Sequence, residues 1–241
     1  MNIKVLYEDN HIIAVYKPAG VLTQGDRSGD LSLMDDVKKY LKEKYKKPGN
    51  VFLGLVHRLD KPVSGIVLFG KTSKGASRLS EQFRNHTIQK TYHGIVVGKP
   101  KETKGSIKEQ VNKISFFAEG FTNKTDEELL AEIKRATKTR TAELDYEVIK
   151  SNDKYSLLRI LPKTGRFHQI RIQMLQMGCP ILGDIKYSSQ KPLPDGSIAL
   201  SATAISFKSA TPLSGVMVRS AGQPETINLE IPLPEAWKRY L

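Results

Sequence analysis

A polar turn that leads directly into a short apolar run constrains the fold of this chain more than any other feature. The turn, His57–Gly65, carries one carboxylate, Asp60, and the apolar run follows at Ile66–Phe69. A short apolar run beside turn residues is typical of a buried strand, so Asp60 is expected at the edge of the core, where a reactive group could act. Asp beside Pro and Gly also often bonds only nearby backbone amides, and this segment alone slightly favours that structural interpretation.

The charge balance points to a polyanionic partner. The 241 residues include 38 Lys plus Arg against 25 Asp plus Glu, a formal net charge of +13, which favours nucleic acid over a membrane. No apolar run approaches the roughly 20 residues of a membrane helix, and the N-terminus lacks the apolar stretch of a secretory signal. The single cysteine, Cys179, excludes an internal disulfide framework. We expect a globular cytoplasmic protein with no membrane association.

Strand and helix patterns are intermixed without a regular βαβ period. This mixture predicts an α+β fold, with a mixed, largely antiparallel central sheet and flanking helices. The basic stretch from about 101 to 140 is expected to be a surface excursion with a helix at 126–135, and Trp237 is expected to plug the core. The expected strands are 12–16, 66–69, 91–97, 141–149, 155–161, 199–201 and 227–231, and the other helical patterns are 33–45, 76–83 and 166–177.

One helical pattern has a basic opposite face. Apolar residues recur every four positions from Leu33 to Tyr45, and Ser32 with Asp35 resembles an N-cap pair at the start. A lysine face of this kind is usually a solvated surface, and contact with RNA is the alternative. The basic residues on the opposite side are Lys38, Lys39, Lys42, Lys46 and Lys47.

Residues 65–72 match the phosphate-loop pattern G-x-x-x-x-G-K-[ST] letter for letter. A phosphate loop follows its strand and exposes backbone amides, whereas here the variable positions Ile66–Phe69 are bulky, β-favouring and themselves the expected strand. The scattered histidines do not pair at zinc-ligand spacing, and Cys179 beside Pro180 is more typical of a buried small residue than of a nucleophile. We therefore predict neither a nucleotide site, nor a metal site, nor Ser or Cys hydrolase chemistry.

Arg171 is a second candidate functional residue. It lies between Ile170 and Ile172, near the start of a helix that must face the core on one side. An arginine drawn toward a core usually has a carboxylate partner, because an unpaired buried charge is strongly destabilising. A structural salt bridge or an exposed arginine on the helix edge remains an equally good interpretation on these residues alone.

Five ordered segments resemble the RluA family of pseudouridine synthases, over essentially the whole chain. The resemblance implies a pseudouridine-synthase-like fold, with 1–241 as a single catalytic domain and an active-site cleft across the sheet. The chain begins almost directly at the first segment, so no room is expected for a separate N-terminal RNA-binding module of the S4 type. The segments are Tyr7–Asn10 with Lys17–Gly20, His57–Gly65, Lys90–Gly94, Thr164–Arg171, and Gly178–Asp184 with Tyr187.

The resemblance also implies roles for individual residues. Asp60 matches the catalytic carboxylate, Tyr92 the aromatic residue that packs against the target base, and Arg171 the ion-pair partner of Asp60. Arg58 matches the position that can enter the RNA stack where the target nucleotide has left. One departure is Val63, where many relatives carry threonine, and this change is expected to affect only local packing.

The expected activity is isomerisation of uridine to pseudouridine in ribosomal or transfer RNA, by a monomer that needs no cofactor or metal. Which RNA is modified stays open, because recognition depends on RNA shape. One alternative is a non-catalytic RNA- or ribosome-binding protein. Another is a glycosidase, which would need a second acid facing Asp60, such as Glu81, Asp145 or Asp184. The residues expected to line the mouth of the site and bind substrate are Arg58, His57, Lys61, Lys90, Arg166 and His168.

Overall fold

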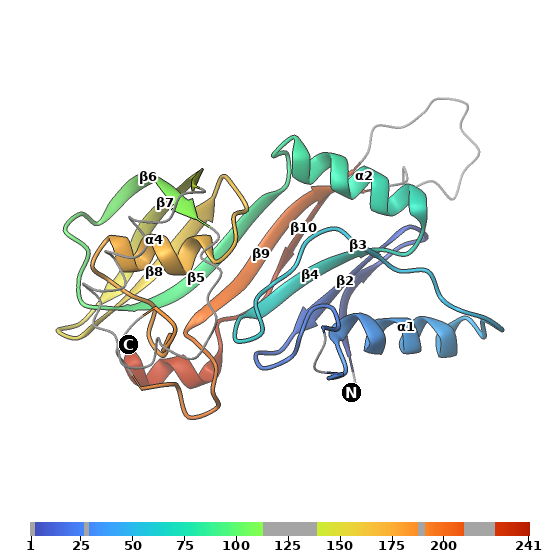
Figure 1. Cartoon of the computed structure of the whole chain (residues 1–241), viewed down its shortest axis with the longest axis horizontal. Coiled ribbons are helices and arrows are strands. Elements are labelled where there is room, and N and C mark those ends of the chain that lie inside the picture. Colours follow the sequence, from blue (N-terminus) through green and yellow to red (C-terminus); the bar gives the residue numbers. More distant parts are fainter. Residues whose placement is uncertain (1–2, 27–28, 113–138, 188–190, 210–224) are drawn as a thin grey trace. The chain divides into compact units, whose positions relative to one another are not determined.

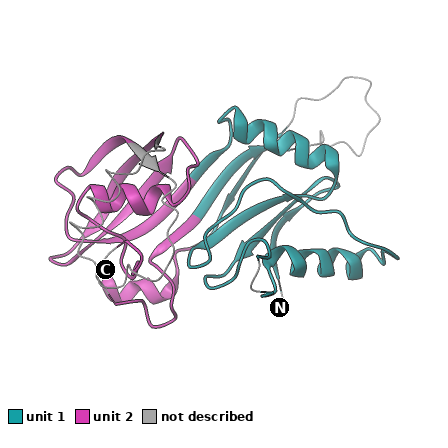
Figure 2. Ribbon diagram, viewed as in Figure 1, with its two compact units in different colours: residues 1–90, 203–231 teal, residues 91–202, 232–241 magenta. Residues whose placement is uncertain are grey.

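The computed structural model describes five stretches of the chain, residues 3–26, 29–112, 139–187, 191–209 and 225–241. The chain divides into two compact units, shown in separate colours in Figure 2. Unit 1 comprises residues 1–90 and 203–231, and unit 2 comprises residues 91–202 and 232–241. No helix in the described stretches has the length and apolarity needed to cross a membrane.

Unit 1 is built on a sheet whose neighbouring strands run in the order β1-β2-β4-β9 (Figure 1). β10 pairs with β9, and β3 pairs with β4. In the antiparallel β2–β4 pair, Lys17 lies opposite Gly65, so the His57–Gly65 turn enters the sheet beside the end of β2. The strands are β1 (Lys4–Glu8), β2 (Ile12–Lys17), β3 (Gly54–Leu55), β4 (Ser64–Gly70), β9 (Leu200–Lys208, of which 203–208 belong to this unit) and β10 (Thr226–Glu230).

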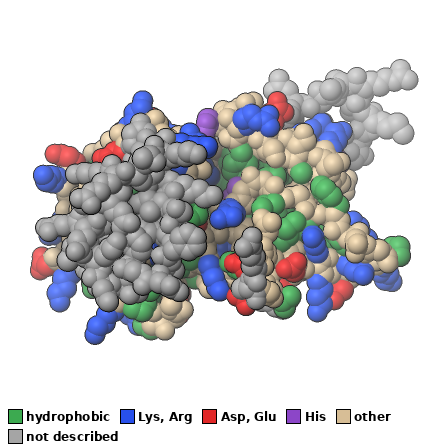
Figure 3. All heavy atoms as spheres, in the orientation of Figure 1, with side chains coloured by type: hydrophobic (Ala, Val, Ile, Leu, Met, Phe, Trp, Pro, Cys, Tyr) green, Lys and Arg blue, Asp and Glu red, His purple; other side chains and the backbone are tan. Residues whose placement is uncertain are grey.

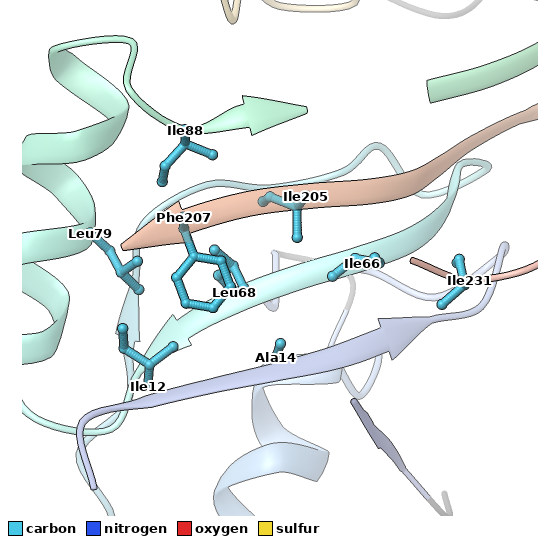
Figure 4. Close-up of a cluster of buried hydrophobic side chains, with 9 residues drawn as sticks. All are labelled: Ile12, Ala14, Ile66, Leu68, Leu79, Ile88, Ile205, Phe207 and Ile231. Atoms are coloured by element: carbon cyan, nitrogen blue, oxygen red, sulfur yellow. The ribbon is translucent and has the colours of Figure 1, made fainter. Parts of the chain in front are cut away.

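The core of unit 1 lies on both faces of this sheet. Ile12 and Ala14 of β2 join one cluster, and Ile13 and Val15, which alternation places on the opposite face, are also fully buried. Helices α1 (Leu33–Lys44) and α2 (Ser73–Arg84) flank the strands of the unit in Figure 1. The cluster drawn in Figure 4 contains Ile12, Ala14, Ile66, Leu68, Leu79, Ile88, Ile205, Phe207 and Ile231.

The first helix confirms the expected N-terminus and corrects the expected apolar face. Ser32 and Asp35 form a reciprocal capping box, and Leu33 is buried in the first turn. Tyr45, predicted on the buried face, instead is the C-cap residue and is 46% exposed. The physical reason is that the helix ends at Lys44, so the four-residue spacing no longer places the next side chain on the same face.

The residues that match the phosphate-loop pattern, 65–72, have structural roles in unit 1. Ile66–Phe69 belong to the fully buried strand β4, as predicted. A Cβ on Gly70 would lie 2.4 Å from the backbone nitrogen of Ala76, so glycine is required for the close approach of α2. Thr72 is the N-cap residue of α2, and its hydroxyl accepts a hydrogen bond from the Gly75 amide. Packing and helix capping therefore account for the pattern.

Unit 2 contains an antiparallel sheet in the order β5-β8-β7-β6. Trp237 is 4% exposed and packs in a cluster with Ile95 and Leu182, so its expected core role is confirmed. The strands and helices are β5 (Gln89–Val97), β6 (Lys104–Asn112), β7 (Thr139–Ser151), β8 (Tyr155–Pro162), α4 (Gln169–Gln176) and the 3-10 helix η1 (Glu235–Tyr240). These intermixed strands and helices confirm the expected α+β fold with a largely antiparallel sheet.

Two segments of unit 2 differ from the sequence-based expectation. β6 lies within the stretch 101–140 and pairs with β7 along its whole length, although no strand was predicted there. The helix expected at 126–135 lies outside the described residues. Helix α4 begins at Gln169 rather than at the expected Arg166. All of Gln169–Leu175 is buried, so the helix is buried on more sides than the single expected apolar stripe predicted.

Candidate active site

The Asp60 turn, residues His57–Gly65, is held in place by its main chain. The Thr23 hydroxyl donates to the Leu59 carbonyl at 2.8 Å and accepts from the Leu59 amide at 3.1 Å. The Gly20 amide donates to the Lys61 carbonyl at 2.8 Å. Asp60 itself is partly buried, and Leu59 and Val63 of the same turn are buried. The expectation that this carboxylate lies at the edge of the core is confirmed.

Lys17 is a functional candidate that the sequence analysis missed as an individual residue. Its side chain is fully buried at the end of β2, and its Nζ donates to three main-chain carbonyls, those of Pro18 (3.1 Å), Val21 (2.7 Å) and Lys61 (3.2 Å). Burial lowers the pKa of Lys17 to about 7, and the charge of Asp60 acts in the opposite direction. Strand alternation was the available signal, since it places Lys17 on the same face as Ile13 and Val15.

Two basic residues of the Asp60 turn face solvent. Arg58 and Lys61 are both exposed, and Lys61 forms an ion pair with Asp30 at 3.2 Å. An exposed pair of this kind contributes little to stability, so the Lys61 side chain can exchange Asp30 for another anion at small cost. Both positions are compatible with the predicted contacts to RNA, which stay predictions.

His57 anchors the start of the same turn to β4. Its Nε2 accepts a hydrogen bond from the Leu68 amide at 2.9 Å, which leaves the ring proton on Nδ1, and the ring packs against Phe83 with centroids 4.7 Å apart. Burial, together with the smaller effect of the nearby Lys90 charge, lowers the pKa of His57 to about 3. Burial also lowers the pKa of Lys90. His57 is thus a neutral structural anchor, and its predicted substrate contact stays a prediction.

In unit 2, Arg171 is the centre of a buried polar cluster. It is 4% exposed, and its Nε and Nη2 donate to the two carboxylate oxygens of Asp184 at 2.6 and 2.7 Å. Its guanidinium lies 4.9 Å from the ring centroid of Tyr187. A carboxylate partner was expected for Arg171 if it was buried, and that partner is Asp184 of the same unit. The predicted pairing of Arg171 with Asp60 of unit 1 stays a prediction.

His168 sits in the same cluster in an unusual backbone conformation. It is the N-cap residue of α4 with φ 49° and ψ 25°, a left-handed conformation that costs a non-glycine residue about 1 kcal/mol or more. Its Nδ1 lies 2.8 Å from the Tyr187 hydroxyl, and its ring stacks on Phe167 with centroids 3.8 Å apart. The Nη1 of Arg171 lies 3.3 Å from the His168 Nε2. Packing and hydrogen bonds therefore hold this ring against the arginine.

The remaining predicted residues of unit 2 lie on the sheet and on the loop before α4. Tyr92 is partly buried in β5, opposite Ile160 of β8. Arg166 is exposed, and its Nε donates to the Thr141 carbonyl at 3.1 Å. Gln169, which is buried, accepts from the Arg166 amide at 3.0 Å and orders the loop. Asp60 belongs to unit 1, whereas Tyr92 and Arg171 belong to unit 2, so the association of the three stays a prediction.

The acids considered for a glycosidase have other partners or other surroundings. Both oxygens of Asp184 bind Arg171, and Asp145 pairs with Lys163 at 2.9 Å. Glu81 is exposed on α2. Within the stretches that the structure describes, there is also no group of three or more His, Cys, Asp or Glu residues that could hold a metal ion.

Comparison with known proteins gives consistent matches. A family model described as RNA pseudouridylate synthase matches residues 11–176. The ribosomal large subunit pseudouridine synthase C of Rickettsia bellii is 34% identical over 191 residues, which cover 79% of this chain and 58% of that protein. The tRNA pseudouridine synthase C of Haemophilus ducreyi is 35% identical over 193 residues, covering 78% and 74%. The chain thus spans little more than half the length of the rickettsial proteins it matches.

Solved structures support the fold. Human RNA pseudouridylate synthase domain containing 4 superposes with a TM-score of 0.72 at 22% identity, covering 98% of this chain and 90% of that chain. Human RNA pseudouridylate synthase domain containing 1 gives a TM-score of 0.64 at 20% identity. The pseudouridine-synthase-like fold expected from the sequence is confirmed.

Proposed function

Because this chain belongs to the RNA pseudouridylate synthase family, which confirms the resemblance seen in its sequence, we propose that it isomerises specific uridines of structured RNA to pseudouridine. Ribosomal and transfer RNA are the two substrate classes that the names of the similar proteins suggest. The observation that carries the proposal is the Asp60 turn, which holds a partly buried carboxylate on a main chain anchored by Thr23, Gly20 and Lys17.

The reaction needs no redox partner and no energy source. The glycosidic bond between N1 and C1′ breaks, the uracil ring turns, and a bond forms between C5 and C1′. The C5 proton is lost and N1 gains one, so atoms and charges balance. The target atoms are shielded in a stacked or paired RNA, and the nucleotide must therefore be flipped out at a cost of a few kcal/mol.

We assign the chemistry to Asp60 acting as a carboxylate. It attacks the ribose C1′ or the uracil ring, or it removes the ribose 2′ proton. Each of these roles needs the carboxylate oxygens at a fixed position, because a small displacement of a reacting group costs much of the rate. The hydrogen bonds to Leu59 and Lys61, the residues on either side of Asp60, support such a fixed position.

Tyr92 and Arg171 are assigned supporting roles. Tyr92 offers a flat ring for the detached uracil and a phenol that can mediate proton movement at C5. Arg171 acts as the ion-pair partner of Asp60. This role is supported by Asp184, which accepts hydrogen bonds from Nε and Nη2 of Arg171 and so orients the guanidinium. The Nη1 edge then lies beside His168.

Basic groups near the site bind the RNA. Arg58, Lys61 and Arg166 are exposed and suit contacts with phosphates, whereas His57, Lys90 and His168 are partly buried and suit the edge of the nucleotide pocket. The net charge of +13 supports a polyanionic substrate, and Lys and Arg side chains (blue) are seen over the visible face in Figure 3. We further propose that the protein acts in the cytoplasm as a monomer, with residues 1–241 as one catalytic domain.

The direct test is tritium release from RNA labelled at uridine C5. The native protein is expected to release tritium from ribosomal or transfer RNA, and Asp60→Ala is expected to lower the rate by at least about a thousandfold while RNA binding persists. A protein that binds RNA but releases no tritium with either variant would instead be a non-catalytic RNA-binding protein. Mapping of modified uridines in cells that lack the protein would then identify the substrate.

A further inference from the structure

The C-terminal end of α1 carries a dense group of cations that the proposed chemistry does not use. Five exposed lysines lie within nine residues of the sequence, a stretch that also contains Tyr45, which is 46% exposed. In Figure 3, Lys and Arg side chains (blue) are visible at the lower right, where α1 lies in Figure 1. We name this group the α1 basic surface, and it consists of Lys39, Lys42, Lys44, Lys46, Lys47 and the Tyr45 ring.

One lysine of the α1 basic surface occupies a position that favours glycine. Lys46 has φ 48°, and the Lys47 amide donates to the Lys42 carbonyl at 3.0 Å, the bond that closes a Schellman-type helix end. The left-handed residue at such an end is usually glycine, because a Cβ is strained there. The chain therefore carries a charged side chain at a position where glycine would satisfy the backbone.

Lys44 and Tyr45 of this surface are held by a nearly buried acid, Glu8, which also binds the neighbouring Lys71. The Glu8 carboxylate accepts from Lys44 at 2.7 Å, from Lys71 at 2.6 Å and from the Tyr45 hydroxyl at 2.6 Å, and its side chain is 9% exposed. The Nζ atoms of Lys44, Lys47 and Lys71 lie 5.5, 5.9 and 4.7 Å from the centroid of the Tyr45 ring. One carboxylate thus bonds two ammonium groups, those of Lys44 and Lys71, and also holds the Tyr45 ring, which lies near a third, that of Lys47.

Helix capping and membrane binding do not explain this arrangement. Lys42 and Lys44 lie in the last helical turn, where cations stabilise the negative end of the helix dipole, but Lys46 and Lys47 lie beyond the helix. A helix that binds a bilayer needs an exposed apolar face. Leu33, Val37 and Leu41 of α1 are buried in unit 1, and every exposed residue of α1 is charged.

We propose that the α1 basic surface binds the sugar–phosphate backbone of a structured RNA, as a second contact remote from the reacting uridine. The first turn of α1 is tied to the segment that anchors the Asp60 turn, since the Met34 amide donates to the carbonyl of Thr23 and Thr23 binds Leu59. The twelve residues of α1, at a rise of about 1.5 Å each, place its C-terminal end about 18 Å from its N-terminal end. The contact therefore requires an RNA that extends this far from the flipped nucleotide.

The inference deepens the proposed function and rests on it for the identity of the polyanion. Phosphate contacts release counterions, so the logarithm of the binding constant falls linearly with the logarithm of the salt concentration. Each phosphate contact that is removed makes this slope shallower by about one unit. The test variant is Lys39→Gln with Lys42→Gln and Lys46→Gln, which leaves the Glu8 contacts intact. The matched control removes three exposed lysines of unit 2, by Lys101→Gln, Lys150→Gln and Lys154→Gln.

Binding is measured across a salt series with a long structured ribosomal RNA fragment and with a short hairpin that contains only the target uridine and its stem. We expect the α1 variant to bind the long RNA at least about tenfold more weakly at low salt, with a slope reduced by two to three, and to bind the short hairpin normally. The control variant is expected to match the native protein. Equal losses in both variants, or a native slope in the α1 variant, would overturn the proposal.

A single substitution separates function from structure at Lys46. Lys46→Gly relieves the left-handed strain, so we expect a thermal midpoint at or above that of the native protein together with weaker binding to the long RNA. Unchanged RNA binding by Lys46→Gly and by Lys46→Gln would count against the inference. The inference would also be contradicted if the triple variant lost binding to phosphatidylserine vesicles but still bound RNA normally.

The outcomes distinguish this inference from the proposed function. If Asp60-dependent tritium release is found while the triple variant binds long RNA normally, only the inference fails. If no pseudouridine forms but RNA binding depends on the α1 basic surface, the inference stands and the proposed activity fails.

Discussion

The guanidinium of Arg171 and the carboxylate of Asp184 form a buried ion pair through two hydrogen bonds of 2.6 and 2.7 Å, with both side chains almost inaccessible to solvent. A bidentate pair fixes the plane of the guanidinium as well as its position. In this way Asp184 orients the one arginine to which family resemblance assigns a role beside Asp60.

Loss of this pair is expected to be costly. Asp184→Ala leaves Arg171 charged and buried without its carboxylate, and we expect the free energy of unfolding to fall by about 3–5 kcal/mol in urea titrations. The matched control is Glu147→Ala, which removes the carboxylate of the exposed pair with Arg159 and is expected to change stability by about 1 kcal/mol or less. Equal effects of the two variants would contradict the assignment of Asp184 as a buried partner.

Arg171→Ala is expected to lower turnover as well as stability, since the proposed ion pair with Asp60 is lost together with the one to Asp184. Turnover is measured by tritium release at a temperature where the variant remains folded. A variant that loses only thermal stability would reduce Arg171 to a structural role.

Lys17 predicts a specific pH dependence of stability. Its pKa is lowered from 10.5 to about 7 in the folded state, so between these values the unfolded chain binds a proton that the folded chain has lost. The contribution of Lys17 to the free energy of unfolding is therefore fully present above pH 10.5. It is lost as pH falls toward 7, by at most about 1.4 kcal/mol per pH unit. Lys17→Met is expected to flatten this part of the profile, whereas Lys74→Met, at an exposed lysine of α2, should leave it unchanged.

His57 predicts the acid side of the same profile. Burial lowers its pKa from 6.5 to about 3, so stability is lost as pH falls from 6.5 toward 3, where only the unfolded chain takes up the proton. His57→Gln is expected to reduce this acid loss in chemical denaturation at pH 4 relative to pH 7. His86→Asn, which changes an exposed histidine, should keep the native profile. An identical acid loss in His57→Gln and the native protein would show that other groups cause it.

Thr23 tests the anchoring of the Asp60 turn. Thr23→Val keeps the shape of the side chain but removes the hydroxyl that bonds both the amide and the carbonyl of Leu59. Two buried backbone groups lose their partner, and we expect a loss of about 1–3 kcal/mol in stability and a fall in turnover. Thr23→Ser keeps the hydroxyl and should retain both properties. Native turnover in Thr23→Val would mean that the other anchors suffice.

Local patterns in the sequence determined much of this fold. The apolar run after the Asp60 turn is strand β4, and Ser32 with Asp35 caps α1 as expected. The bulky β-favouring residues at positions 66–69, inside the phosphate-loop pattern, also form a strand as predicted. Such features depend on residues a few positions apart, whose geometry the backbone sets directly.

Only the tertiary structure decided which distant groups meet. Arg171 takes Asp184 as its buried partner, Lys17 binds the carbonyl of Lys61 across 44 positions, and the ring of His57 accepts the amide of Leu68. Charge and burial arguments require that such groups have partners but do not identify them, because the choice depends on how separate segments of the chain pack together. The sequence by itself thus determined the family and the position of Asp60, the proposed reactive carboxylate, at the edge of the core. Long-range packing determined what holds the turn around Asp60 in place.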